Sequence, residues 1–286
     1  FQKQGNIMKA IDAITQLNPN KWAETTPVER LYLLEAIRTN IKIYGNELAG
    51  ADYKIKNNIL GAHLYPAPTS KLDTIVPMVN TISVAINLYK SLINQEILRP
   101  LKAEKIEDDL FNIYVFRQEQ KGKLMYADRK DLLYVTDQRK QINPMDKPVD
   151  TLAVLGTNNH SSSLEIVKAI FFKNCTVVHK SHHLSAETDK VWKKIMQPLI
   201  EHGALSFCDS DQGQALNLIF QSADPRLTKI SFIGVRGTAE AIMLANDTPS
   251  ISECDNNNTC ILSLVLVLGQ KKKLSLKLYE SPQYPN

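Results

Sequence analysis

The residues best suited to chemistry lie in the C-terminal half, directly after short apolar segments. Lys180 ends a strand predicted at 176–180 and is followed closely by His182 and His183. A lysine at a strand tip can donate hydrogen bonds to ribose hydroxyls or neutralise a phosphate, and a solvated loop lysine has the same sequence signature. The segment therefore predicts a ligand contact at Lys180, with a solvated side chain as the alternative.

Three histidines in this segment, at 179, 182 and 183, raise the question of a metal site. No Asp, Glu or Cys recurs beside them at the spacing of metal ligands, and His179 lies within the predicted strand. We therefore expect no metal here. The four cysteines have no CxxC spacing and are too few for a disulfide scaffold, which indicates a reducing compartment.

Glycines that follow predicted strands are a second group of candidates. Only Gly156 follows the first strand of the C-terminal half, so the dinucleotide fingerprint G-x-G-x-x-G is absent. Gly234 and Val235 follow the fourth strand and lead into a helix that begins near Thr238. Free N–H groups at a helix N-terminus bind pyrophosphate well, although an ordinary helix start capped by Thr238 has the same sequence.

The elements that position these residues alternate regularly from about residue 150. Short apolar strands separated by amphipathic helices predict an α/β fold: a Rossmann-like, mostly parallel sheet with helices on both faces. Ligands of such sheets bind at the carboxyl ends of the strands, where Lys180 and Gly234 are expected. The predicted strands are 151–156, 176–180, 205–208, 230–234 and 261–268, and the predicted helices are 162–172, 186–202, 212–221 and 237–245.

The preceding part of the chain is predicted as a helical region followed by a β-hairpin. A capping box at Thr26 and Glu29, with a proline between them, begins a helix that we expect to end before Gly45. The chain thus divides into an N-terminal region, 1–150, and a Rossmann-like unit, 151–286. The predicted N-terminal elements are helices over 5–17, 27–44 and 70–96 and hairpin strands over 111–116 and 133–136, with a turn at Lys121.

Length and composition fit an ordinary globular protein. The 286 residues correspond to one large domain or two smaller ones. The chain has 34 basic and 30 acidic residues, and a net charge of +4 is too small to indicate that it binds nucleic acid. Unbroken apolar stretches fall well short of the ~18 residues that a membrane span needs. We expect a soluble, cytoplasmic protein with neither a membrane nor a nucleic acid as partner.

Five segments, in their order and spacing, resemble the aldehyde dehydrogenase superfamily, and in particular a divergent bacterial-type branch of it. The resemblance covers most of the chain. The segments are Trp22 with Val28-Glu-Arg-Leu-Tyr-Leu-Leu34, Leu155-Gly-Thr-Asn-Asn-His-Ser-Ser162, Phe171-Phe-Lys-Asn-Cys-Thr-Val-Val-His-Lys180, Pro198-Leu-Ile-Glu-His-Gly-Ala-Leu205 and Ile230-Ser-Phe-Ile-Gly-Val-Arg-Gly-Thr-Ala-Glu-Ala-Ile242.

The resemblance implies NAD or NADP as the coenzyme and a small-molecule aldehyde as the substrate. Lys180 would match the lysine that holds the adenosine ribose, while Gly234 and Thr238 would match the turn and helix start under the pyrophosphate. Asn159 would match the asparagine of an oxyanion hole, with Asn158 as the alternative. We therefore expect a coenzyme site at the carboxyl edge of the sheet.

The sequence also departs from the pattern of this family. Val235 replaces a serine, and His183 stands where a small or acidic residue is expected, which leaves the choice between NAD and NADP open. We nevertheless expect Val235 and His183, together with Gly213, to contact the coenzyme.

The catalytic part of the pattern is altered more strongly. In Leu266-Val-Leu-Gly-Gln-Lys271, Val267 occupies the position of the general-base glutamate, and a hydrocarbon cannot accept a proton. The resemblance would place the catalytic cysteine beyond Asn286. It implies an NAD(P)-dependent aldehyde dehydrogenase-like protein without its catalytic thiol domain. The complete enzyme would oxidise an aldehyde to a carboxylic acid or an acyl derivative, and the isolated chain would be inactive. The alternatives are an inactive relative that serves as a nucleotide-binding or assembly subunit, and an α/β domain for another phosphate ligand. A homo-oligomer is a further expectation.

Overall fold

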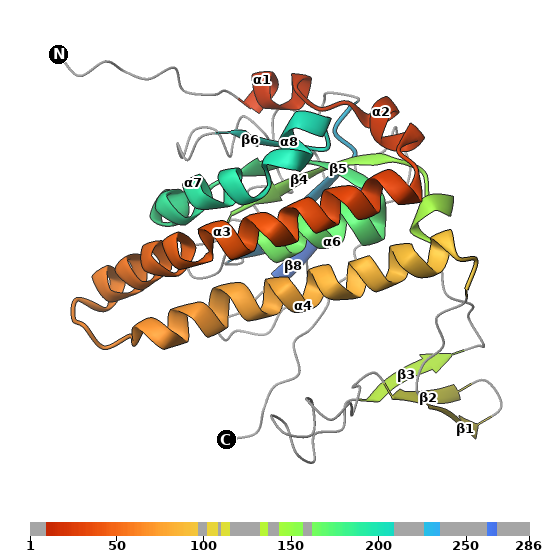
Figure 1. The fold of residues 1–286 in the computed structure, drawn as a ribbon. Helices are drawn as coiled ribbons and strands as arrows, with labels where there is room; N and C mark the ends of the chain where they lie inside the picture. Colours follow the sequence, from red (N-terminus) through yellow and green to blue (C-terminus); the bar gives the residue numbers. More distant parts are fainter. Residues whose placement is uncertain are drawn as a thin grey trace, which may run out of the picture.

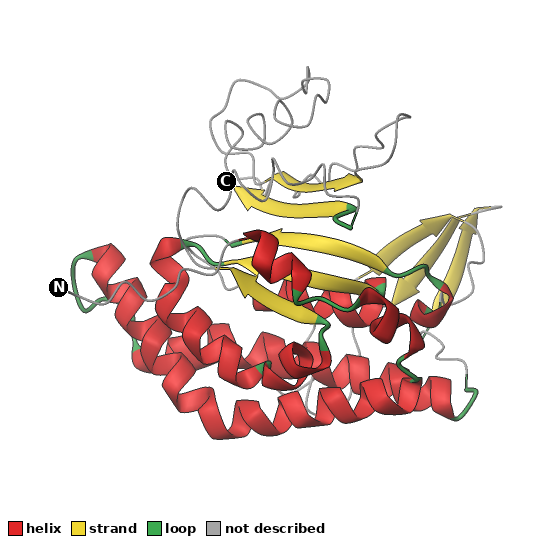
Figure 2. Ribbon diagram, turned by 90° about the horizontal axis from the view of Figure 1, so that it is seen from above, coloured by secondary structure: helices red, strands yellow, loops and turns green. Residues whose placement is uncertain are grey.

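The computed structural model describes residues 10–96, 102–107, 110–114, 132–136, 143–156, 162–208, 226–234 and 262–267. These residues form a five-stranded sheet, a three-stranded sheet and a set of helices (Figure 1). The long helices lie together on one side of the five-stranded sheet (Figure 2). The helices predicted at 212–221 and 237–245 fall outside the described residues.

The five-stranded sheet has the order β6-β5-β4-β7-β8, and its first four members run parallel. This confirms the mostly parallel α/β sheet. The last strand, β8, pairs antiparallel with β7, so the sheet is mostly parallel rather than entirely parallel. An antiparallel edge strand on an otherwise parallel sheet is common in α/β proteins. The strands are β4 (Asp150–Leu155), β5 (Cys175–Lys180), β6 (Leu205–Cys208), β7 (Lys229–Gly234) and β8 (Leu262–Val267).

The helices pack with this sheet around one apolar core. Side chains from the N-terminal helices, such as Trp22 and Ile37, share that core with Val154 and Val177 of the sheet. Every residue of β5 is buried, so both faces of the sheet are covered at this strand. The described helices are α1 (Ala10–Thr15), α2 (Pro19–Glu24), α3 (Pro27–Leu60), α4 (Ala67–Ile93), α6 (Ser163–Lys173), α7 (Ala186–Ile195) and α8 (Gln197–His202).

Helix α3 begins as predicted and continues much further. Thr26 and Glu29 form the capping box, with the Glu29 carboxylate accepting a 2.7 Å bond from the Thr26 N–H. The predicted end before Gly45 is wrong, because the helix reaches Leu60. A Cβ at Gly45 would lie 3.2 Å from Cδ1 of Ile75 in α4, so this glycine permits close packing of two helices rather than ending one.

The single helix predicted over 186–202 is two helices, α7 and α8, that meet at Met196. Pro198 in the first turn of α8 has no N–H to continue the hydrogen-bond ladder, and its ring would clash with the carbonyl of Lys194 in an unbroken helix. The amide of Asn40 in α3 donates to the carbonyls of Lys194 and Ile195, at 3.4 and 3.1 Å. The α3 side chain thus donates to two carbonyls at the end of α7 that would accept from the next turn in an unbroken helix.

Arg30 of α3 is fully buried at the junction of α2, α3 and α4. Its guanidinium donates to the carbonyls of Trp22 and Thr25, at 2.8 and 3.2 Å, and to the Tyr89 hydroxyl at 3.3 Å. It also lies 4.0 Å from the centre of the Trp22 ring. The two carbonyls are at the end of α2, where a cation interacts favourably with the helix dipole. Tyr89 in turn donates to the carbonyl of Phe171 in α6, so Arg30 connects four helices.

Among the described helices, α4 alone is long and apolar enough to cross a membrane by length and mean hydropathy. Its buried residues include Met78, Ile82 and Tyr89, which belong to the apolar core. A core helix of a globular protein passes the same test of length and hydropathy.

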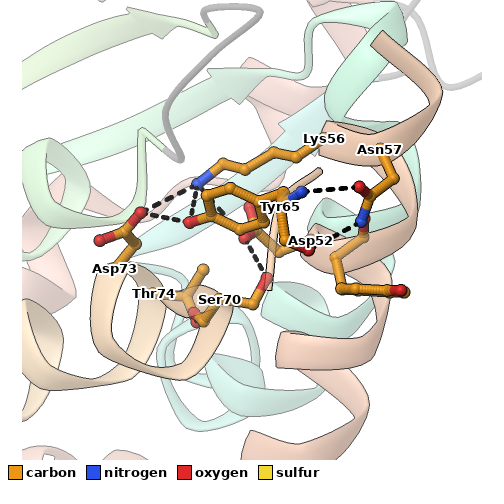
Figure 3. A network of polar contacts seen from close by, with 8 residues as sticks. Asp52, Lys56, Asn57, Tyr65, Ser70, Asp73 and Thr74 are labelled. Atoms are coloured by element: carbon orange, nitrogen blue, oxygen red, sulfur yellow. Dashed lines mark hydrogen bonds and ion pairs between the residues drawn. The ribbon is translucent and has the colours of Figure 1, made fainter. Parts of the chain in front are cut away.

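A cluster of polar side chains joins the end of α3 to the start of α4 (Figure 3). The Lys56 ammonium donates to the Tyr65 hydroxyl at 2.9 Å and forms ion pairs with Asp52 and Asp73, at 3.3 and 3.4 Å. The Asn57 side chain exchanges two hydrogen bonds with the backbone of Tyr65. These bonds hold the turn of the α3–α4 hairpin.

The second sheet consists of three antiparallel strands, β1 (Ala103–Glu107), β2 (Leu110–Tyr114) and β3 (Leu132–Thr136). The pairing of β2 with β3 confirms the predicted hairpin, whose turn lies outside the described residues. The third member, β1, was not predicted because its sequence, AEKIE, lacks a regular apolar alternation. None of the described residues in these three strands is buried.

Candidate functional site

The carboxyl ends of β4, β5, β6 and β7 meet at one edge of the five-stranded sheet. Leu155, Lys180 and Cys208 are register neighbours at the ends of three successive strands, and Gly234 ends β7. The structure therefore places Lys180 and Gly234 at the same edge, as the sequence predicted. This edge is the usual location of ligand sites in open α/β sheets.

The side chain of Lys180 is buried, with 7% of the residue exposed, so it is not the solvated loop lysine of the alternative interpretation. Its ammonium donates to the carbonyl of Ser181 at 3.3 Å. Burying an ammonium is costly unless polar groups surround it. The arrangement thus concentrates positive charge and a hydrogen-bond donor at the tip of β5.

Gly156, the residue directly after β4, packs against the segment that follows β5. Its N–H donates to the carbonyl of Lys180 at 2.7 Å. A Cβ at this position would lie 2.7 Å from the backbone nitrogen of His182 and 2.8 Å from the carbonyl oxygen of Lys180. Only glycine fits this contact, and the space that a side chain would take is filled by residues 180–182.

The three histidines of this segment do not converge on one point. His179 turns toward α7, whereas the rings of His182 and His183 lie 4.2 Å apart in the loop. Burial, followed by the positive charges of His183 and Lys180, lowers the pKa of His182, which favours its neutral form. Within the part of the chain that the structure describes, no group of three His, Cys, Asp or Glu side chains is placed to hold a metal ion.

Sequence reasoning missed the partner of His179, which is Asp189. Nδ1 of His179 lies 3.1 Å from the carbonyl of Val154, and Nε2 lies 3.3 Å from the Asp189 carboxylate. Because a carbonyl only accepts, Nδ1 donates a hydrogen to Val154, and Nε2 faces the Asp189 carboxylate. The pair is buried and ties β4 and β5 to α7 beside Lys180. An acidic residue on the apolar stripe of α7, three positions before Trp192, was the available signal.

Neither described cysteine is arranged as a nucleophile. Burial raises the pKa of the Cys175 thiol to about 11, and its Sγ donates to the Lys173 carbonyl at the amino end of β5, away from Lys180. The thiol of Cys208 is buried and donates to the carbonyl of His179 at 3.5 Å. Cys254 and Cys260 lie outside the described residues.

The remaining predicted site residues cannot be placed at this edge from the described structure. Val267 is described by its backbone: it ends β8 opposite Lys229, at the amino end of β7 rather than beside Lys180. The residues outside the described ranges are Asn158, Asn159, Gly213, Val235 and Thr238.

Comparison with solved structures finds the same fold in aldehyde dehydrogenases. A putative aldehyde dehydrogenase from Burkholderia cenocepacia superposes with a TM-score of 0.51 at 10% identity, over 84% of this chain and 42% of that one. An NADP-dependent enzyme of E. coli gives a TM-score of 0.50 at 14% identity, over 82% of this chain and 40% of that one. The chain therefore spans about two fifths of the length of these enzymes. No family model matches the sequence, and no curated protein matches it significantly.

These comparisons establish the class of fold. The chain shares the fold of part of the aldehyde dehydrogenases, which confirms, for the fold, the resemblance seen in the sequence. At these levels of identity the likeness concerns architecture alone.

Proposed function

We propose that this chain binds NAD or NADP at the carboxyl edge of β4, β5, β6 and β7, with Lys180 contacting the adenosine ribose. The observation that carries the proposal is a buried lysine at the tip of a parallel strand, in a fold shared with aldehyde dehydrogenases. An ammonium there can donate to ribose hydroxyls or to a 2′-phosphate. His183 follows in the same loop, and the choice between the two coenzymes stays open.

The described residues fit the adenosine half of a dinucleotide. Lys180 supplies a donor at the strand tip, and the N–H of Gly156 donates to its backbone carbonyl. Gly156 itself offers no cradle for a pyrophosphate, because the backbone of residues 180–182 fills the space beside it. When bound, the nicotinamide of such a coenzyme supplies hydride-transfer chemistry. Gly234, Val235 and Thr238 are the residues we propose for the pyrophosphate.

Replacing Lys180 by Met is expected to lower the affinity for the coenzyme by roughly ten- to a hundredfold. Methionine keeps the apolar stem and removes the donor, and a charge-assisted hydrogen bond contributes roughly 1.5–3 kcal/mol. Calorimetric titration with NAD and with NADP measures the change. Lys190→Met is the matched control, because Lys190 is exposed on α7 and forms an exposed ion pair with Glu187. Equal affinity of the Lys180→Met and unmodified chains would contradict the ribose contact.

The 286-residue chain is expected to oxidise no aldehyde. Cys175 has a raised pKa and no access to solvent, Cys208 is buried, and Val267 cannot serve as a base. The measurement is the absorbance of reduced coenzyme over a panel of aldehydes, with an active aldehyde dehydrogenase as positive control. Sustained turnover by this chain would contradict this prediction and leave the proposal of coenzyme binding in place.

A second candidate function is that of an inactive superfamily member, which binds nucleotide or supports assembly. The absence of a buried residue in the described part of the three-stranded sheet favours a surface that associates with another chain. Coenzyme binding without turnover, together with a homo-oligomer in light scattering, would support this function. Preferential binding of another phosphate ligand in a competition titration would instead favour a different α/β binding domain.

A further inference from the structure

A short loop, residues 181–185, connects the tip of β5 to α7 and follows Lys180 directly. The carbonyl of Ser181 in this loop accepts from the Lys180 ammonium at 3.3 Å. Within the loop, the N–H of Ser185 donates to the carbonyl of His182 at 2.9 Å. The conformation of the loop therefore affects where the Lys180 ammonium is held.

A contact between two buried side chains, His179 and Asp189, brackets this loop. His179 precedes Lys180 in β5, and Asp189 lies in the first turn of α7, just beyond the loop. Nε2 of His179 lies 3.3 Å from the Asp189 carboxylate, and the two side chains are 1% and 6% exposed. The contact thus joins the strand before the loop to the helix after it.

The two residues of this contact are held in different ways. The His179 ring is fixed from two neighbouring strands, because Nδ1 lies 3.1 Å from the Val154 carbonyl of β4 and the Phe207 ring of β6 meets it edge-on at 5.2 Å. Helix α7 is held mainly by buried apolar side chains such as Trp192. Apolar burial has no preferred direction, whereas a hydrogen bond does. The bond to His179 therefore determines where the first turn of α7 lies along β5.

We propose that Asp189 is a positioning residue of the coenzyme site. Through His179 it fixes the first turn of α7, and with it the loop whose Ser181 carbonyl holds the Lys180 ammonium. A loop that is already ordered in the free chain binds its ligand more tightly, because less conformational entropy is lost on binding. The choice of ligand in this inference rests on the proposed function, and the geometry of the loop does not.

Calorimetric titration with NAD and with NADP tests this role in the 286-residue chain. Asp189→Ala is expected to lower the affinity by roughly three- to tenfold, because the loop must then be ordered on binding. In Asp189→Asn the amide can donate to Nε2 of His179, so the affinity should return to within about twofold of the unmodified chain. An Asp189→Asn chain that binds as weakly as Asp189→Ala would overturn the proposal.

Glu187→Ala is the matched control for Asp189→Ala. Glu187 is the other acidic residue in the first turn of α7, and it is exposed and pairs with Lys190. Its replacement removes the same charge from the helix N-terminus without touching His179, and the affinity should not change. An equal loss of affinity in Glu187→Ala and Asp189→Ala would overturn the proposal, since the charge of the first turn would then explain both.

A double-mutant cycle with Lys180→Met separates positioning from a general effect on the fold. Without the ammonium, the loop has nothing to hold for the coenzyme, so adding Asp189→Ala should lower the affinity by less than about twofold further. The same loss with and without Lys180 would show that Asp189 acts on the fold as a whole, and the proposal would be wrong.

Hydrogen exchange read by mass spectrometry tests the loop without any ligand. Peptides that cover residues 181–185 are expected to lose protection by roughly three- to tenfold in Asp189→Ala, relative to peptides of β4, and to regain it in Asp189→Asn. Unchanged protection in Asp189→Ala would overturn the proposal. If the unmodified chain binds neither coenzyme, the proposed function is wrong, and exchange still decides whether Asp189 holds the loop.

A second variant keeps the test decisive if Asp189→Ala does not fold. His179→Phe combined with Asp189→Leu replaces the buried pair with apolar side chains, an exchange that folded proteins often tolerate. The new ring keeps the position beside Phe207, and the directional bond is lost. Affinity and loop protection should fall as for Asp189→Ala. Unmodified values of both in this double variant would show that packing alone positions the loop, and would overturn the proposal.

Discussion

Arg30→Met is expected to lower the free energy of unfolding by about 3–5 kcal/mol. The substitution removes three hydrogen bonds and leaves the carbonyls of Trp22 and Thr25 without the cation at the end of α2. Hydrogen bonds from a charged donor are stronger than neutral ones, and buried acceptors left unsatisfied carry a further cost. Methionine also loses the contact of the guanidinium with the Trp22 ring.

Urea unfolding followed by circular dichroism measures this change. The control is Arg38→Met on the same helix, because the Arg38 side chain is 41% exposed and pairs with Glu35 at 3.9 Å on the helix surface. It should change the free energy of unfolding by no more than about 0.5 kcal/mol. Arg30→Lys keeps a charge and loses the planar fork, so most of the destabilisation should remain. Equal stability of the Arg30→Met and Arg38→Met variants would show that Arg30 does not organise the helix junction.

Gly156→Ala is expected to destabilise the chain by about 3 kcal/mol and to weaken coenzyme binding in the same variant. The added Cβ would approach two backbone atoms, of His182 and Lys180, within 2.7 and 2.8 Å. Backbone cannot rotate away as a flexible side chain does, so the loop of residues 180–183 must shift. That shift would displace Lys180 from the position from which we propose that it contacts ribose.

Gly50→Ala is the matched control for this substitution. Gly50 lies within α3, and a Cβ there meets nothing within 4 Å. Since glycine inside a helix is less stable than alanine by roughly 0.5–1 kcal/mol, Gly50→Ala should stabilise the chain by that amount and leave coenzyme binding unchanged. Unfolding midpoints and calorimetric titrations of the two variants provide the comparison. A Gly156→Ala chain as stable as the unmodified one would contradict the tight contact.

Local sequence patterns predicted much of the fold. The capping box at Thr26 marked the start of α3, and the alternation of strands with helices predicted the parallel sheet. The two errors in the helices have different causes. Gly45 looks like a helix end in the sequence, yet the approach of α4 explains it. The break between α7 and α8 has a local cause, because Pro198 cannot continue the hydrogen-bond ladder of α7.

The sequence was enough to predict where the candidate site lies in the fold, but not which side chains contact one another there. A lysine at the end of an apolar strand identified the tip of β5, because the carboxyl ends of parallel strands share one edge. The pairing of His179 with Asp189 depends on how α7 lies across the sheet, and the contact of Thr25 with His202 joins residues 177 positions apart. Such contacts between distant elements cannot be predicted from the spacing of residues along the sequence.

The distance along the chain between Thr25 and His202 sets an order of events during synthesis. At about 5–20 residues per second, a ribosome needs roughly 10–35 s to add the 177 residues that separate them. The α3–α4 hairpin is closed by contacts such as Lys56 with Asp73, only 17 positions apart, and can form early. Helices α1 and α2, with Trp22, must wait for α8 and β6 before they can pack. Until then the side chains of this region that are buried in the folded chain, Trp22 among them, lack those packing partners.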